Sequence, residues 1–283
     1  MAGEAIHIIG AGVMGSGLAE HCARLGHAVV LLDCREQALS SARERIRELA
    51  RLACFLGSGE RPGADEVLGR VTFTTDTAAL KSAIWLLENV TEDREIKRLV
   101  LRECDALCPP ACIFISNTSA LPITELARMT RRPDRVIGVH FMNPVARIPT
   151  VEMIPGEETS DETIVRTTEL LDRLGKRPVV IRDGAGFVSN RLLMGMVNEA
   201  ARLVEEGIAT PQEIDRICRE CFGHRMGPLE TADLIGLDTI VHTLEVLRAA
   251  FPGDRYQVCQ RLVTAVEAGE LGRKSKQGFH TYA

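Results

Sequence analysis

The stretch Gly10-Ala-Gly-Val-Met-Gly15 decides the fold, because of the patterns on either side of it. An apolar run, Ala5–Ile9, leads into it, and a helical pattern, Ser16–Leu25, leads out of it. A second apolar run, Ala28–Asp33, then ends on an acidic residue. Glycines spaced G-x-G-x-x-G between a strand and a helix are typical of a unit in which a tight turn and a helix N-terminus hold the pyrophosphate of a dinucleotide. The stretch therefore predicts a parallel sheet that begins with a dinucleotide-binding βαβ unit.

Each glycine of this turn has its own physical reason to be glycine. Gly10 permits the tight turn, Gly12 lets the backbone approach the pyrophosphate, and Gly15 lets the helix pack closely on the strand. Val13 and Met14 lie between the last two glycines, and we count them with the residues that bind the cofactor. A glycine turn without a ligand and a turn that binds FAD are the alternative interpretations.

Asp33 predicts which dinucleotide binds. Its carboxylate is expected to accept hydrogen bonds from the ribose hydroxyls, and its charge repels a 2′-phosphate. Arg35 follows two residues later and favours NADP instead, because a guanidinium at that place holds the phosphate. We expect NAD as the cofactor.

The chain changes character near residue 182. Up to that point short apolar runs alternate with amphipathic helical stretches, which is the pattern of a parallel sheet flanked by helices. The later patterns have the helical period, over 187–206, 211–221, 228–250 and 258–268. The sequence thus predicts the α/β class: a Rossmann-type, doubly wound, mainly parallel sheet domain over residues 1–182, followed by an all-α helical bundle over residues 183–283.

Composition and charge exclude several classes of function. A net charge of −5 argues against DNA or RNA as the main partner, because neutralising phosphates needs a basic surface. No apolar run reaches the ~18 residues of a membrane span and the N-terminus lacks a signal-peptide pattern, so we expect no membrane partner and a cytoplasmic protein. Nine cysteines are an odd number, and Cys218-Arg-Glu-Cys221 has no second ligand pair, so we expect reduced thiols and no metal.

A histidine and a glutamate predict acid–base chemistry. His140 ends the strand expected within the apolar run 135–141, at the edge where an open α/β sheet binds ligands. Glu152 lies in the next run, 150–154, beyond a turn at Asn143-Pro144, so the two are expected to be neighbours across a hairpin. An imidazole with a carboxylate behind it suits removal of a proton from an alcohol as hydride leaves. A purely structural histidine is the alternative.

Taken together, these motifs resemble the 3-hydroxyacyl-CoA dehydrogenase family, and the resemblance covers nearly the whole chain. The matching segments are Gly10–Gly15, Glu88–Glu92, Ser116-Asn-Thr-Ser119, His140-Phe-Met-Asn-Pro144, Val151-Glu152, Gly186-Phe-Val-Ser-Asn190-Arg-Leu-Leu, Met226-Gly-Pro-Leu, Gly236-Leu-Asp238 and Gly272-Arg-Lys-Ser-Lys-Gln-Gly-Phe279. The resemblance implies an NAD-dependent dehydrogenase that oxidises the 3-hydroxyl group of a hydroxyacyl thioester.

The resemblance also implies a role for each matching residue at the reacting end. His140 would be the general base and Glu152 the partner that orients it. Ser119 and Asn190 would hydrogen-bond the reacting hydroxyl, the thioester carbonyl or the imidazole, and Asn143 would join them at the substrate. Capping of the following helices is the alternative role for Ser119 and Asn190.

Further cofactor contacts and an oligomer are implied as well. Glu92 and Lys97 would lie along the nicotinamide and substrate channel, and Asn117 beside the cofactor. The helical domain would close the active site and form a homodimer. The apolar run Leu192–Val197 suits a helix buried at such an interface, and it suits the core of a single chain equally well.

The sequence departs from the family where relatives that act on CoA esters contact the CoA. They carry a serine and a lysine late in the helix after the second strand, and a gap-free count from Asp33 finds Leu49 and Leu56 at those places. Ile148–Glu152 and Leu229–Gly236 are more similar to a subgroup from polyketide extender-unit biosynthesis, which oxidises hydroxyacyl groups on an acyl carrier protein to products such as hydroxymalonyl-ACP. We therefore expect a carrier-protein substrate.

Positive charge on the same helix supports this interpretation. Arg43, Arg47 and Arg51 recur at four-residue intervals along one face, where they would attract an acidic carrier protein. A CoA ester, as used in fatty acid metabolism, is the alternative substrate. A non-catalytic NAD(H) sensor is the more remote alternative, because a fold does not determine function.

Overall fold

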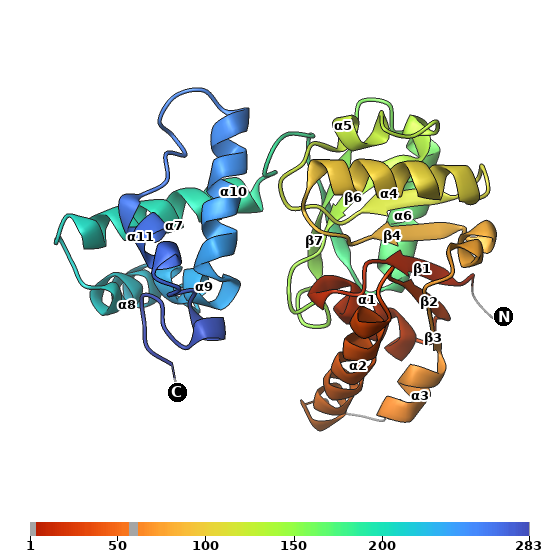
Figure 1. Cartoon of the computed structure of the whole chain (residues 1–283), viewed down its shortest axis with the longest axis horizontal. Coiled ribbons are helices and arrows are strands. Elements are labelled where there is room, and N and C mark those ends of the chain that lie inside the picture. The colour runs from red at the N-terminus through yellow and green to blue at the C-terminus, as the bar shows by residue number, and fades with distance from the viewer. Residues whose placement is uncertain (1–3, 57–61, 283) are drawn as a thin grey trace. The chain divides into compact units, whose positions relative to one another are not determined.

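The apolar runs of the N-terminal part pair into one eight-stranded sheet, in the order β3-β2-β1-β4-β5-β6-β7-β8 (Figure 1). Neighbouring strands are parallel except for β6 and β7, which are antiparallel. The strands are β1 (Ile6–Ile9), β2 (Val29–Leu32), β3 (Val71–Thr74), β4 (Trp85–Glu88), β5 (Ile113–Ser116), β6 (Val136–His140), β7 (Thr150–Pro155) and β8 (Arg177–Val180). In this computed structural model, which describes residues 4–56 and 62–282, the sheet lies in the first of two compact units, Met1–Gly184 and Ala185–Ala283.

Helices cover both faces of the sheet. In Figure 1, α4 and α5 lie on one face and α1, α2 and α3 on the other. The helices of this unit are α1 (Val13–Arg24), α2 (Glu36–Leu56), α3 (Ala64–Gly69), α4 (Arg94–Leu107), α5 (Ile123–Ala127) and α6 (Asp161–Arg173). Leu18 of α1, Ile46 of α2 and Leu170 of α6 share one hydrophobic cluster with the strands. The strands β4 and β5 are buried along their whole length, as expected for parallel strands covered on both faces.

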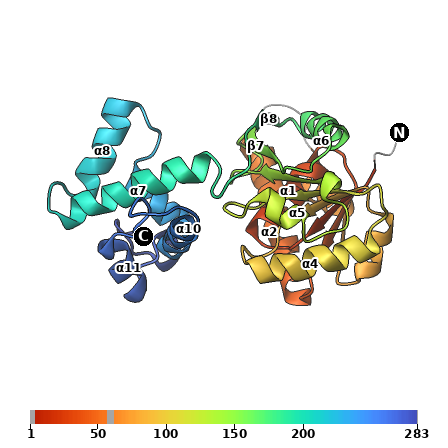
Figure 2. The same ribbon diagram turned by 90° about the horizontal axis from the view of Figure 1, so that it is seen from above.

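The second unit is helical and has its own core (Figure 2). Its helices are α7 (Ser189–Glu205), α8 (Pro211–Phe222), α9 (Pro228–Ile235), α10 (Leu237–Ala250) and α11 (Gln260–Glu267). Val197, Leu229, Ile240 and Leu244 are fully buried in this core. The predicted α/β fold, with a mainly parallel sheet followed by a helical domain, is confirmed.

One predicted helix is wrong. The sequence pattern predicts a single helix over 228–250, whereas the structure has α9 and α10 with a break at Gly236. Gly236 has φ of +108°, which no α-helical residue adopts, so the helix ends and a new one begins. The apolar period continues across the break because both helices bury one face in the same core.

The strand register places the functional loops at one edge of the sheet. Ile9 pairs with both Leu32 and Glu88, and Glu88 pairs with Ser116. The loops that follow β1, β2, β4, β5 and β6 therefore leave the sheet side by side, at the edge where open α/β sheets bind ligands. Among the described residues, no helix is both long and apolar enough to cross a bilayer.

Candidate active site

At Gly10 and Gly15, the turn after β1 leaves room for backbone only. Gly10 has φ of +95°, and a Cβ on it would lie 2.5 Å from the carbonyl oxygen of Asn89. A Cβ on Gly15 would lie 1.9 Å from the carbonyl oxygen of Gly10, so α1 packs on the turn only because this side chain is absent. A Cβ on Gly12 would meet no atom within 4 Å, and Gly12 begins α1 without a side-chain cap. The first N–H groups of α1 thus open onto space in which an anion can bind.

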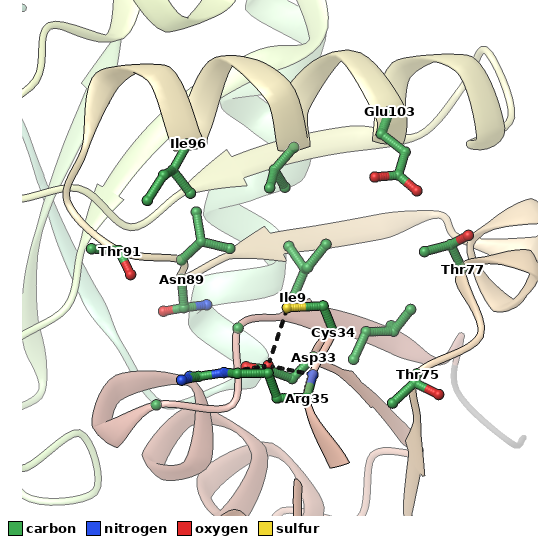
Figure 3. Close-up of a pocket in the computed structure, with 15 residues that line it drawn as sticks. Ile9, Asp33, Cys34, Arg35, Thr75, Thr77, Asn89, Thr91, Ile96 and Glu103 are labelled. Carbon is green, nitrogen blue, oxygen red and sulfur yellow. Dashed lines mark hydrogen bonds and ion pairs between the residues drawn. The ribbon is translucent and has the colours of Figure 1, made fainter. Parts of the chain in front are cut away.

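A cavity of 440 Å³ lies beside this turn (Figure 3). Its wall includes Asp33, whose Oδ2 accepts a hydrogen bond from the Ala11 N–H at 2.9 Å and whose Oδ1 accepts one from the Arg35 N–H at 3.0 Å. The Arg35 guanidinium is exposed and lies 3.6 Å from Asp33 Oδ1. Glu103 of α4 lies across the cavity (Figure 3), so two carboxylates border the space. This charge disfavours a 2′-phosphate.

The donor and acceptor groups around the cavity fit NAD. The α1 N-terminus offers N–H donors to a pyrophosphate, and Asp33 offers acceptors to ribose hydroxyls. Val13 is 54% exposed at the start of α1, whereas Met14 packs against the core. Asn117 connects two loops: its side chain donates to Asn89 Oδ1 at 2.7 Å and accepts from the Phe141 N–H at 3.0 Å. Asn89 lines the cavity, so Asn117 supports that wall from behind.

The structure corrects the expected place of Lys97. Its side chain is fully buried and does not line a channel. Lys97 Nζ lies 2.7 and 2.9 Å from the two carboxylate oxygens of Glu88, and 3.5 Å from Glu92 Oε2. Burial opposes the charge of Lys97, but the attraction of Glu88 and Glu92 prevails and raises its pKa. Lys97 therefore acts on the site through the carboxylates that it holds.

Glu92 organises the loop after β5. Its Oε1 accepts hydrogen bonds from the Thr118 hydroxyl at 2.5 Å, the Ser119 N–H at 2.8 Å and the Ala120 N–H at 2.9 Å. Because Lys97 holds the other oxygen, the carboxylate is fixed on both sides. The backbone of Ser119 is thus positioned by a residue of the neighbouring loop.

His140 and Glu152 lie opposite each other on β6 and β7. His140 Nδ1 is 2.8 Å from Glu152 Oε2, and the two residues are only 7% and 8% exposed. An ionised carboxylate can only accept a hydrogen bond, so the neutral form of the imidazole has its proton on Nδ1 and its lone pair on Nε2. This arrangement can accept a proton at Nε2 and stabilise the resulting imidazolium.

The alternative roles of Ser119 and Asn190 as helix caps do not match the geometry. The N-terminus of α5 is capped by Asp183, which accepts hydrogen bonds from the N–H groups of Ile123 at 2.8 Å and Thr124 at 2.7 Å. Asn190 lies inside the first turn of α7, whose N-cap is Val188 and has no side-chain cap. Asn190 belongs to the second unit and His140 to the first.

The sequence analysis assigned no role to two carboxylates, Glu88 and Asp183, that hold side chains and backbone near the site. Glu88 ends a buried strand, and a carboxylate at the end of an apolar run was the signal that could have identified it. Nothing local marks Asp183, because its partners are about sixty residues earlier in the chain. In the described part of the chain, no group of three His, Cys, Asp or Glu residues could hold a metal ion.

Comparison with known proteins covers almost the whole chain. Residues 5–184 match the family model "3-hydroxyacyl-CoA dehydrogenase, NAD binding domain", and residues 186–282 match "3-hydroxyacyl-CoA dehydrogenase, C-terminal domain". A probable 3-hydroxybutyryl-CoA dehydrogenase of Deinococcus radiodurans is 42% identical over 276 residues, which are 97% of this chain and 99% of that protein.

Solved structures are similar over the same length. FadB2 of Mycobacterium tuberculosis has a TM-score of 0.95 and 38% identity, with 100% of both chains covered. The (S)-3-hydroxybutyryl-CoA dehydrogenase PaaH1 of Ralstonia eutropha has a TM-score of 0.91 and 37% identity, with 99% of both chains covered. The chain is thus similar to these proteins in both of its units.

Proposed function

Because the chain belongs to the 3-hydroxyacyl-CoA dehydrogenase family, an NAD-dependent family that acts on CH–OH groups, we propose that it oxidises a short 3-hydroxyacyl-CoA such as 3-hydroxybutyryl-CoA. The names of the relatives support a CoA ester, in place of the carrier-protein substrate expected from the sequence. The carrier-protein substrate becomes the second candidate.

In the proposed reaction the C3–H bond breaks and its hydrogen leaves as hydride. The hydroxyl group loses its proton, so that a carbonyl group forms at C3. NAD, when bound, supplies the hydride acceptor. His140 takes the proton at Nε2, because its Nδ1–H is engaged by Glu152 at 2.8 Å. The carboxylate of Glu152 keeps this tautomer in place and stabilises the imidazolium as it forms.

Three further residues are assigned to the substrate in this proposal. Ser119 and Asn190 hydrogen-bond the reacting hydroxyl or the thioester carbonyl, and Asn143 contributes from the loop after β6. The positioning of the Ser119 N–H by Glu92 at 2.8 Å supports the role of Ser119. Asn143 is exposed and precedes Pro144 through a cis peptide bond.

One observation carries the proposal: a buried His140–Glu152 pair at the ligand-binding edge of a sheet whose first turn fits NAD. The test follows NADH absorbance with 3-hydroxybutyryl-CoA, and with butyryl-CoA as the matched compound that lacks the hydroxyl. We expect NADH only from the hydroxy ester. The absence of NADH with all 3-hydroxyacyl thioesters, on CoA and on a carrier protein, would refute the proposal.

The side chains of α2 favour the second candidate, a substrate on an acyl carrier protein. Leu49 and Leu52 line a cavity of 550 Å³ beside α1, so α2 itself contributes apolar groups there, whereas basic side chains of other segments (Arg24, Arg147 and Lys176) line the same cavity. The side chain of Leu56 lies outside the described residues. The leucines of α2 would therefore contribute little affinity for the nucleotide end of CoA.

The arginines of α2 weaken the same candidate. Arg43 stacks on the ring of Phe73 at 4.1 Å, and Arg47 forms an ion pair with Glu44 at 2.6 Å. Arg51 is exposed, so the face presents less unpaired positive charge than the spacing predicts.

One comparison separates the two substrates: the same acyl group on CoA and on a carrier protein, at two ionic strengths. With a CoA substrate, we expect kcat/KM to be at least as high for the CoA ester. A preference of about tenfold or more for the carrier protein at low salt would favour the second candidate. That preference should fade with salt, because exposed charges are screened over about 10 Å at 0.1 M, and with charge reversal at Arg47 and Arg51.

A further inference from the structure

Lys176 is a buried lysine whose ammonium binds the backbone of the loop between β6 and β7. Its side chain is only 3% exposed. Lys176 Nζ donates hydrogen bonds to the carbonyl oxygens of Val145 and Ile148, the second at 3.0 Å. Among the described residues no carboxylate forms an ion pair with it. The carbonyl groups of this loop are therefore its main partners.

Burying an ammonium beside neutral partners is costly, and its neighbours add little compensation. Burial lowers the pKa of Lys176 to about 8, with the thiol of Cys22 raising it and the guanidinium of Arg24 lowering it further. The facing groups of α1 are Glu20, His21, Cys22 and Arg24, and Arg147 of the loop lines the adjoining cavity. The hydrogen bonds to the carbonyl groups of Val145 and Ile148 are what offsets the cost of burying this charge.

The base of the Lys176 side chain is itself held firmly. Gly175, with φ of +64°, ends the turn after α6, and the Lys176 N–H donates to the Leu171 carbonyl at 2.8 Å. His21 Nε2 bonds the Leu174 carbonyl at 2.8 Å, which ties the same turn to α1. The ammonium therefore extends from a fixed point of the fold.

The loop that Lys176 holds joins the two members of the catalytic pair. His140 ends β6, Glu152 is the third residue of β7, and residues 141–149 connect the two strands. The segment with Lys176 binds this loop a second time, because the Arg177 N–H donates to the Pro149 carbonyl at 2.8 Å. The distance of 2.8 Å between His140 Nδ1 and Glu152 Oε2 depends on how the two strands leave that loop.

We propose that Lys176 is a positioning residue for the dehydrogenase reaction: by holding the carbonyl groups of Val145 and Ile148, it keeps Glu152 hydrogen-bonded to His140. The inference rests on the proposed function, in which His140 is the base. Lys176 itself touches neither substrate nor cofactor in this role.

The test compares three variants by steady-state kinetics with 3-hydroxybutyryl-CoA. Lys176→Met removes the donors and keeps the length of the side chain, and we expect kcat to fall about tenfold or more with NADH affinity within about twofold. Lys176→Arg keeps a charged donor, and the cavity of 550 Å³ beside Lys176 gives it room, so we expect it to restore most of kcat. Leu174→Val is the matched control, because it weakens packing in the same turn and leaves the hydrogen bonds of Lys176 Nζ in place.

A spectroscopic measurement reads the hydrogen bond directly. The ¹⁵N shifts of the His140 imidazole, assigned against His140→Gln, should report a bonded Nδ1–H in the wild type and in Lys176→Arg and a weakened bond in Lys176→Met. If Lys176→Met does not fold, Lys176→Gln retains one amide donor and is expected to lie between Met and the wild type in both kcat and imidazole shift.

Two results would overturn the proposal. The first is a Lys176→Met protein that keeps more than about half of the wild-type kcat or, if that variant does not fold, a Lys176→Gln protein with the full wild-type kcat. The second is an imidazole spectrum of His140 that those changes leave unaltered. A wild type that oxidises no thioester would instead refute the proposed function, and the imidazole spectra would still decide the role of Lys176.

Discussion

At the scale of single residues, carboxylates decide what the site can do. Glu152 selects the tautomer of His140 by accepting its Nδ1–H, and Glu92 sets the backbone of Ser119. Asp33 has one oxygen bonded to the Ala11 N–H, so its orientation toward the cavity is set before a ligand arrives. Preorganised acceptors of this kind lose little entropy on binding.

The first prediction concerns Asp33. Asp33→Ser should lower kcat/KM for NAD about 10- to 100-fold and improve that for NADP, because a hydrogen bond to a charged group contributes about 1.5–3 kcal/mol. Asp33→Asn is the control, since it keeps an acceptor for the Ala11 N–H and removes the charge. Initial rates with NAD and with NADP give kcat/KM for each cofactor. Equal values for NAD and NADP in the wild type would contradict the role of Asp33.

The second prediction concerns the catalytic pair. His140→Gln should lower kcat by about 10² to 10⁴, because that is the usual contribution of a positioned base, and leave NADH binding unchanged. Glu152→Gln should lower kcat by a similar or smaller factor, since the base remains and the charge behind it is lost. His224→Gln, an exposed histidine of the second unit, is the control. A His140 variant with more than about a tenth of the wild-type rate would exclude it as the base.

At the scale of elements, the change of strand direction between β6 and β7 creates the pair. β7 returns along β6, so residues twelve apart in the chain lie opposite each other. A parallel connection would need a crossover of a dozen or more residues. It would also place the start of the next strand at the far edge of the sheet, away from His140. β8 runs parallel to β7, with Arg177 opposite Thr150, so Lys176, which immediately precedes β8, reaches the loop of the pair.

A third prediction tests the cap of α5. Asp183→Ala removes acceptors from the Ile123 N–H, the Thr124 N–H and the Thr124 hydroxyl, and should lower the free energy of unfolding by about 2 kcal/mol. Asp183→Asn keeps an oxygen acceptor and should cost less than half as much. Urea unfolding followed by circular dichroism measures both. Equal stability of Asp183→Ala and the wild type would show that the cap contributes nothing.

At the scale of the whole molecule, buried ionisable groups connect the site to stability. His21 lies under the turn after α6, and burial, together with the charges of Lys176 and Arg24, lowers its pKa to about 4. Burial likewise lowers the pKa of Lys176 in the same unit, to about 8. His21 and Lys176 therefore bind protons less strongly in the folded state than in the unfolded chain.

The fourth prediction follows from His21. Its pKa in the folded state is about 4, below the ordinary 6.5, so between these values the unfolded chain binds more protons and stability falls as pH falls. The loss amounts to at most about 3 kcal/mol. We expect His21→Gln, which keeps a donor for the Leu174 carbonyl, to lose less stability than the wild type between about pH 7 and about pH 4.5 in urea unfolding. The same loss in both proteins would exclude His21 as the cause.

The fifth prediction concerns the oligomer. We expect a homodimer formed by the helical unit, and light scattering should give about twice the chain mass of 31.0 kDa. Leu192 of α7 is 69% exposed, whereas Met194 and Val197 of the same run are buried in the core of the unit. Leu192→Glu should therefore shift the mass toward the monomer, and Val165→Glu, on an exposed site of α6, should leave it unchanged. A monomeric wild type at micromolar concentration would contradict the expectation.

The sequence by itself determined the features whose signals are local. The glycine turn, Asp33 after β2 and the alternation of strands and helices could be predicted because each depends on neighbours within a few residues. The His140–Glu152 pairing could also be predicted, since a short connection between two strands leaves few registers.

Only the tertiary structure decided which distant polar groups meet. Lys97 turned inward to Glu88, Asp183 capped a helix about sixty residues earlier, and Lys176 bound the carbonyl groups of a loop about thirty residues earlier. Apolar periodicity shows which face of an element is buried, but it does not show which charge lies opposite a buried polar group. The packing of the elements determines that partner. A buried polar atom without a hydrogen bond is costly, so it bonds to whichever polar group the fold places beside it.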